Sequence, residues 1–153
     1  MHAVHTFLVT SLLALSATVA AEPISFRHLP PGASLEVGFR SSGCFHQTDF
    51  AFHFERAADQ SVHVTVHDLQ NSKKLGSLAL SESDLAGLDN LMKAYRHLPL
   101  GGCTTEDTLT LVQKKDGKAV ASETITDSTC DISRRKDLLQ FATLTERLKK
   151  QGK

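Results

Sequence analysis

The chain has 153 residues, and its 17 basic and 17 acidic side chains give a formal net charge of zero at neutral pH. Proteins dedicated to nucleic acids rely on excess positive charge to displace counterions, so this balance argues against a nucleic-acid partner. With 41% hydrophobic residues, the chain is long enough for one domain with a hydrophobic core.

The first 21 residues are typical of a secretory signal peptide. Residues 7–15 (FLVTSLLAL) form a short uncharged apolar run, and small residues lead to a cleavage position after Ala21. The run is shorter than the roughly 20 apolar residues that span a bilayer. We therefore expect no transmembrane segment and a secreted or periplasmic location; the alternative is an N-terminal helix.

Residues 22–33 contain Pro and Gly and are expected to form an irregular lead-in, followed by a single domain over residues 34–150. Apolar and polar residues alternate within 35–39, 50–54 and 62–66, which predicts strands there. The residues in these runs are aromatic or β-branched in most apolar positions, as half-buried sheet surfaces require. A fourth, short strand is predicted over 75–80.

The hydrophobic period then changes from two to the spacing of a helix. Ser81, with Asp84 three residues later, resembles a capping box at the start of this helix. Pro99 and the pair Gly101-Gly102 predict its end. The apolar stripe consists of Leu85, Leu88, Met92 and Tyr95.

Strand-like runs at 109–112 and 120–126 flank Asp116-Gly117, a strong hairpin signal. A two-residue turn at Asp116-Gly117 would place Lys115 opposite Lys118, and the residue numbers of every further pair would also sum to 233. A register one residue away would instead place Leu109, Leu111 and Ile125 on one face, which buries them better. Beyond the hairpin, Leu138, Phe141, Leu144 and Leu148 predict a second helix, capped by Asp131 or Ser133.

These elements predict an α+β fold in the order ββββαββα. About six strands are expected to form an antiparallel sheet, with the two helices packed on one face. The order of the strands within the sheet does not follow from the local patterns.

Three cysteines follow the predicted cleavage position, and an oxidising compartment favours a disulfide among them. Cys103 and Cys130 lie just beyond the two ends of the Asp-Gly hairpin, so we predict that they form the bridge. This pairing leaves Cys44 as a free thiol, which would permit a dimer through Cys44. The alternative is a bridge from Cys44 to either partner.

Histidines on the 50–66 hairpin are candidate metal ligands. With Phe54 opposite Val62, His53 would lie directly opposite His63 on the polar face, with Cβ atoms about 5 Å apart. Zinc sites need three or four ligands, so this pair would need at least one more from elsewhere. The alternative is a solvent-facing pair of imidazoles that become charged near pH 6.5.

Catalytic signatures are sparse. Cys44 and His46 would share a face if both lay on a strand, which is the only nucleophile and base pairing that the sequence suggests. The chain has no Gly-x-Ser-x-Gly elbow, phosphate-binding Gly-rich loop or His-Glu-x-x-His helix. The sequence thus does not decide whether the protein is an enzyme, although the missing motifs favour a non-catalytic protein. No cofactor is predicted.

The leading functional hypothesis is an exported, non-catalytic binding module, with inhibition of an extracellular hydrolase as a specific form. Its partner would be a protein or a small ligand. The expected binding surface is the polar sheet face with the turn residues 55–60 and 114–118, of which Lys114, Lys115, Asp116 and Lys118 are the charged members of the second turn. The alternatives are a metal-binding or metal-sensing protein using His53 and His63, and a small secreted hydrolase.

Overall fold

The computed structural model describes residues 22–97, 99, 101–130 and 143–150. Three sequence predictions lie outside these residues: the signal peptide, the cap of the second helix at Asp131 or Ser133, and the helical positions Leu138 and Phe141. The predicted division into lead-in and domain at residue 34 stays a prediction.

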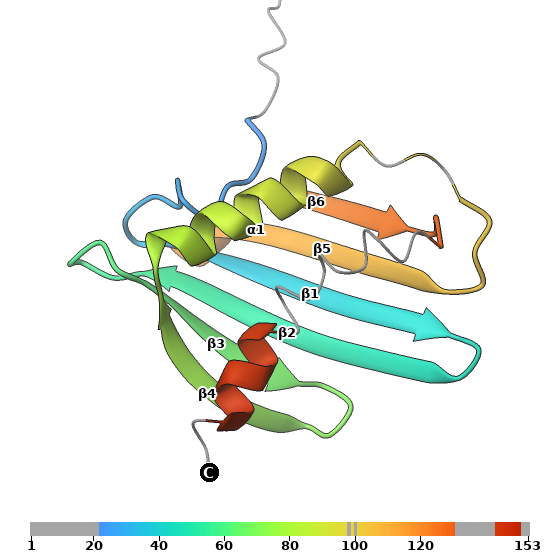
Figure 1. Ribbon diagram of the computed structural model, residues 1–153. Coiled ribbons are helices and arrows are strands. Elements are labelled where there is room, and N and C mark those ends of the chain that lie inside the picture. Colours follow the sequence, from blue (N-terminus) through green and yellow to red (C-terminus); the bar gives the residue numbers. More distant parts are fainter. Residues whose placement is uncertain (1–21, 98, 100, 131–142, 151–153) are drawn as a thin grey trace, which may run out of the picture.

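Six strands form one antiparallel sheet, as the alternating patterns predicted (Figure 1). Their order in the sheet is β4-β3-β2-β1-β5-β6, so β1 has β2 on one side and β5 on the other. The chain therefore crosses from the β4 edge, through the helix, to β5, which pairs with the second side of β1. The strands are β1 (Ala33–Gly43), β2 (His46–Arg56), β3 (Val62–Asp68), β4 (Lys73–Leu80), β5 (Glu106–Lys115) and β6 (Lys118–Asp127).

The predicted first helix is confirmed as α1 (Glu82–Tyr95), and its capping box is present. The Ser81 hydroxyl accepts from the Asp84 amide at 3.2 Å, and the Asp84 carboxylate accepts from the Ser81 amide at 2.9 Å. These two bonds satisfy amides that a helix start leaves unpaired. Residues 143–150 form a second helical segment. No helix in the described part of the chain is long and apolar enough to cross a membrane.

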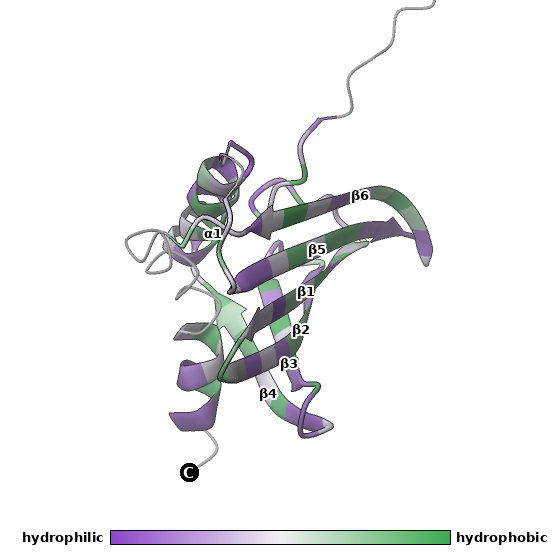
Figure 2. Cartoon of the chain, turned by 90° about the vertical axis from the view of Figure 1, so that its right-hand side faces the viewer, coloured by the Kyte–Doolittle hydropathy of each residue, from purple (hydrophilic) through white to green (hydrophobic). Residues whose placement is uncertain are grey.

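One hydrophobic cluster joins the sheet to both helical segments. Alternate strand residues are buried, which Figure 2 shows as alternating bands of hydropathy along the strands. The rings of Phe52 and Phe54 lie 6.4 Å apart within it, and Phe26 meets Phe54 edge to face at 4.9 Å. Leu144 and Leu148 of the second helical segment belong to the same cluster. Full burial of each such side chain contributes about 1.5–3 kcal/mol.

The β5–β6 hairpin reconciles the two registers that the sequence allowed. Asp116 and Gly117 have φ values of 50° and 74°, as a two-residue type I′ turn requires, and Lys115 pairs with Lys118. The register then shifts by one between Gln113 and Lys114, which leaves Val120 as the extra residue of a bulge. Beyond the bulge, Leu109 lies opposite Ile125 and both are buried.

The predicted register of the β2–β3 hairpin is wrong by two residues. Phe54 lies opposite Val64 rather than Val62, because β2 continues to Arg56 and the connection is shorter than expected. The connection closes with a bond from the Ala57 amide to the Ser61 carbonyl at 2.8 Å. A shift of two residues keeps every side chain on its predicted face.

The lead-in before β1 has no regular secondary structure but is anchored to α1. The Asp89 carboxylate accepts from the Phe26 amide at 2.7 Å and from the Ser25 hydroxyl at 2.8 Å. Ile24, Phe26 and Leu29 are buried in the hydrophobic cluster. The lead-in therefore belongs to the packed body of the molecule.

Candidate functional site

The sheet face opposite the buried cluster, here called the open face, carries mainly polar side chains. It is rich in hydroxyl groups on β5 and β6. Across its middle lie the smallest side chains, Gly38 of β1 and Ala51 of β2, which are ladder partners. Its other central members are Glu36, Arg40 and Ser42 of β1, Asp49 and His53 of β2, Thr65 and His67 of β3, and Thr108, Thr110 and Val112 of β5.

Two adjoining hollows follow β1 along the open face, and we call them together the β1 groove. The first, the Arg40 hollow, has a volume of about 460 Å³ and is lined by Gly38, Arg40, Ser42, Asp49, Glu106, Thr108 and Thr110. The second, the His53 hollow, has a volume of about 350 Å³ and is lined by Glu36, Val37, Gly38, Ala51, Phe52, His53, His67, Thr110 and Val112. Gly38 and Thr110 are common to both.

Gly38 forms the floor of the groove, although its backbone conformation does not require a glycine. It does not have a positive φ, and its ladders to β2 and β5 run without a bulge. A Cβ atom built there would meet Thr110 Cβ at 3.9 Å, an ordinary contact. Because glycine weakens a strand interior, its use often marks a place where a ligand or another backbone approaches closely.

The Arg40 hollow holds three charged groups with no ion-pair partner among the described residues. Arg40 and Asp49 are ladder partners across β1 and β2, and Glu106 lies opposite Ser42 on β5. Neither carboxylate is within ion-pair distance of Arg40 or of another described cation, unlike the pairs at Arg96 and Lys114. The charges of this hollow are thus available to a bound molecule.

The His53 hollow brings together different histidines from the predicted pair. His53 lies directly opposite Thr65, so the predicted direct contact with His63 is wrong. His63 and His67 are both diagonal neighbours of His53, and His67 joins it in lining the hollow. Diagonal Cβ atoms are about 7–8 Å apart, farther than the opposed pair would have been.

A metal site at these histidines stays a prediction. The His63 ring nitrogen lies 3.0 Å from the Ser61 hydroxyl, so one imidazole already has a local partner. Within residues 22–130 and 143–150, as far as they are described, no three His, Cys, Asp or Glu side chains are grouped to hold an ion. A site at His53 and His63 would need further ligands.

The predicted disulfide is present: Cys103 and Cys130 are bonded, with Cα atoms 5.2 Å apart. Cys44 is free and exposed, as the cysteine count predicted. It lies with Phe45 in the two-residue turn between β1 and β2, not on a strand, so the strand geometry assumed for a Cys44 and His46 pair is wrong. The His46 side chain lies outside the described part of the structure.

The predicted binding turn 114–118 is exposed over Lys115, Asp116 and Lys118. Lys114 is engaged, because its ammonium lies 2.7 Å from the Glu36 carboxylate on the open face. This turn and the β2–β3 connection lie at the same end of the sheet, since Ala33 pairs with Lys115 and Ser34 pairs with Glu55.

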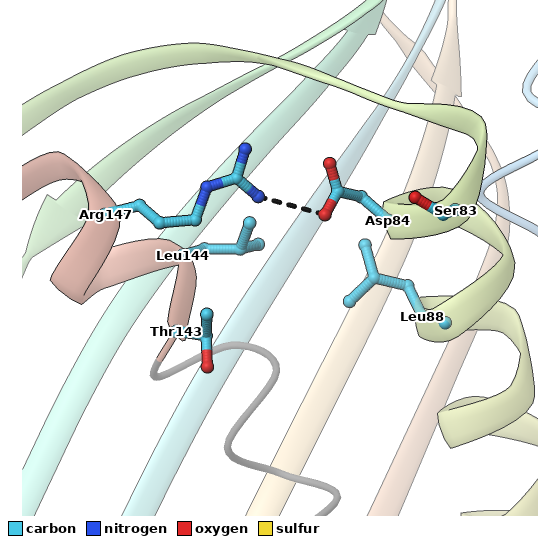
Figure 3. Close-up of a pocket in the computed structure, with 7 residues that line it drawn as sticks. Ser83, Asp84, Leu88, Thr143, Leu144 and Arg147 are labelled. Carbon is cyan, nitrogen blue, oxygen red and sulfur yellow. Dashed lines mark hydrogen bonds and ion pairs between the residues drawn. The ribbon is translucent and has the colours of Figure 1, made fainter.

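A third pocket, of about 240 Å³, lies between α1 and residues 143–150 (Figure 3). At its edge, the Arg147 guanidinium lies 3.0 Å from the Asp84 carboxylate. Burial acts to raise the pKa of Asp84, but hydrogen bonds from Ser81 and the charge of Arg147 outweigh it and lower that pKa. Asp84 therefore stabilises the fold at pH values above its unfolded pKa, and the contribution is lost as pH falls through its folded pKa. Its bonds assign it a structural role.

Two acidic residues near the ends of β5 and β6 are buried on the core face. Asp107 and Asp127 are ladder partners on β5 and β6 and are 7% and 6% exposed. Asp127 accepts from the Thr129 amide and hydroxyl at 2.9 and 2.7 Å, whereas Asp107 Oδ1 has no hydrogen-bond partner among the residues that the structure describes. Two carboxylates alone are too few ligands for a calcium ion.

No protein-family model, no curated protein and no solved structure matches this chain.

Proposed function

We propose that this chain is an exported, non-catalytic binding protein whose ligand lies in the β1 groove. The observation that carries the proposal is Gly38, a glycine in a central strand where neither conformation nor crowding requires one. The groove above Gly38 lies on the open face, opposite the hydrophobic cluster. We infer that both helices cover the opposite face, which leaves this surface free for a ligand.

Export is part of the proposal and has two supports. The N-terminal sequence has the features of a signal peptide, and the Cys103–Cys130 bridge suits an oxidising compartment. Disulfides are rare in reducing cytosol, so the bridge and the leader agree.

The shape of the groove favours an extended ligand. It follows β1 from Glu36 to Ser42, and strand residues rise about 3.3 Å each, so its length is about 20 Å. The floor is narrow and small, while hydroxyl and charged groups line the sides. The aromatic rings of β2 are buried in the core cluster or packed against it, so none provides the stacking platform that sugar ligands favour. We therefore propose a peptide segment as the ligand.

Amide chemical shifts of the isotopically labelled chain, without residues 1–21, provide the test. Pools of short synthetic peptides are expected to shift the amides of Gly38, Ala51 and Thr110. Gly38→Leu fills the floor and should abolish these shifts. The matched control is Ala79→Leu, an exposed position on the same face of edge strand β4, which should leave them unchanged.

Two results would overturn the proposal. One is the absence of groove shifts with every peptide pool. The other is binding that Gly38→Leu leaves intact, which would place the ligand elsewhere. Inhibition of an extracellular hydrolase remains a specific form of the proposal, tested by adding the protein to purified secreted hydrolases. Retained activity in every assay would remove that form without touching peptide binding.

A further inference from the structure

The β1–β2 turn exposes a large aromatic side chain to solvent. Gly43 pairs with His46, so Cys44 and Phe45 alone form the turn, and Phe45 is fully exposed at 101%. Leu69, 49% exposed, lies at the same end, because its amide donates to the Asp49 carbonyl at 3.0 Å. Aromatic side chains, including Phe, are enriched at protein interfaces.

The Arg40 hollow lies directly beside this turn. Its outermost lining residue on β1 is Ser42, next to the turn, and Ser42 pairs with both Gln47 and Glu106. The hollow, at about 460 Å³, has room for a phenylalanine side chain from another molecule, whose ring would lie against its polar and charged lining.

We propose that two copies of this chain pair through this end, with Phe45 of each copy occupying the Arg40 hollow of the other. Phe45 and the Arg40 hollow lie side by side on one surface. A two-fold axis can therefore place each Phe45 in the hollow of the other copy, and such a contact closes as a dimer and does not extend into a filament. The patch is small, so the dimer is weak and forms at high protein concentration.

The charges around the turn suit a second copy. Arg40 and the two carboxylates Asp49 and Glu106 have no ion-pair partner among the described residues. Across a two-fold axis, the guanidinium of one copy can face the carboxylates of the other, which makes the surface complementary to itself. The dimer does not require that the β1 groove bind a peptide, but it would cover the Arg40 half of that groove.

Sedimentation velocity over a wide concentration range tests the dimer. The chain without residues 1–21 is used with Cys44→Ser, so that a disulfide between copies cannot produce the result. We expect a reversible monomer–dimer equilibrium, weakened at least tenfold by Phe45→Ser. The matched control is Val120→Ser, which removes another exposed apolar side chain near the other end of the sheet and should leave the dimer unchanged.

A charge exchange tests the geometry. Arg40→Glu should weaken the dimer, and the double variant Arg40→Glu with Glu106→Arg should restore much of it. A monomer at every concentration overturns the proposal, as does dimerisation that Phe45→Ser leaves unchanged. Binding of Phe45 to phospholipid vesicles without self-association would assign this end to a membrane surface instead. None of these outcomes depends on whether peptides shift the Gly38 amide.

Discussion

The two hairpins that flank β1 are stabilised in different ways. In the β2–β3 hairpin the core face is apolar along nearly its whole length, with Phe52, Phe54 and Val64 among the least exposed residues. In the β5–β6 hairpin, Asp107, Glu123 and Asp127 interrupt that face. There the Cys103–Cys130 bond and an ion pair to Arg96 add what apolar burial does not supply. The covalent bridge therefore belongs to the hairpin whose core face is interrupted by polar residues.

Removing a ring from the apolar hairpin should have the largest effect. Phe52→Ala is expected to lower the free energy of unfolding by about 4 kcal/mol, because it removes a large buried side chain and leaves a cavity. The neighbouring His53→Ala, on the open face, should change it by less than about 0.5 kcal/mol. Urea unfolding of both variants measures the difference, and similar losses would mean that the two faces are not divided as described.

Opening the bridge of the other hairpin should come next. With a sequence separation of 27 between the cysteines, loop closure predicts a loss of about 3.5 kcal/mol for Cys103→Ser with Cys130→Ser. Thermal unfolding of this double variant checks the value, with Cys44→Ser as the control because that thiol is free. An unchanged stability would show that the ion pair and the ladder hold this hairpin alone.

The ion pair of the same hairpin is expected to contribute less. Arg96 lies 2.7 and 2.8 Å from the Glu123 carboxylate oxygens and also donates to the Ile24 carbonyl. The hydrogen bond and charge of Glu123 raise the pKa of Arg96. Arg96→Met leaves these acceptors unpaired and should cost about 1–3 kcal/mol in urea unfolding. The control Arg27→Met breaks an exposed pair with Glu82 and should cost under about 1 kcal/mol.

The smallest expected change in stability is at Gly38 of β1, between the two hairpins, and it is a gain. Gly38→Ala should raise the free energy of unfolding by about 0.5 kcal/mol, since alanine fits the strand conformation and the available space. The same methyl group raises the floor of the β1 groove. Greater stability together with weaker peptide binding, measured on one sample, would show that the glycine serves the groove. A loss of stability would show that the strand itself requires glycine.

Local chemistry could be predicted well from the sequence. Asp116-Gly117 predicted the turn, and the burial of Leu109 with Ile125 predicted the register beyond it; the bulge at Val120 satisfies both. Ser81 and Asp84 likewise predicted the capping box. In each case the residues that decide the geometry are within a few positions of one another.

Registers and strand order could not be predicted in the same way. The alternation of Phe and Val in β2 and β3 repeats every two residues, so a shift of two leaves the pattern unchanged and only the connection decides. The groove has the same limitation, because Gly38 becomes a floor only once β2 and β5 lie on either side of β1. Its sole signal in the sequence is a glycine inside an alternating strand.

The central position of β1 has a consequence for how the newly made chain behaves. One of its two neighbours, β5, is synthesised only after β2, β3, β4 and α1 have emerged. Until then β1 presents an unpaired edge that could pair with other nascent molecules. The interval between emergence of the first and fifth strands is thus a period in which the edge of β1 is open to pairing with another molecule.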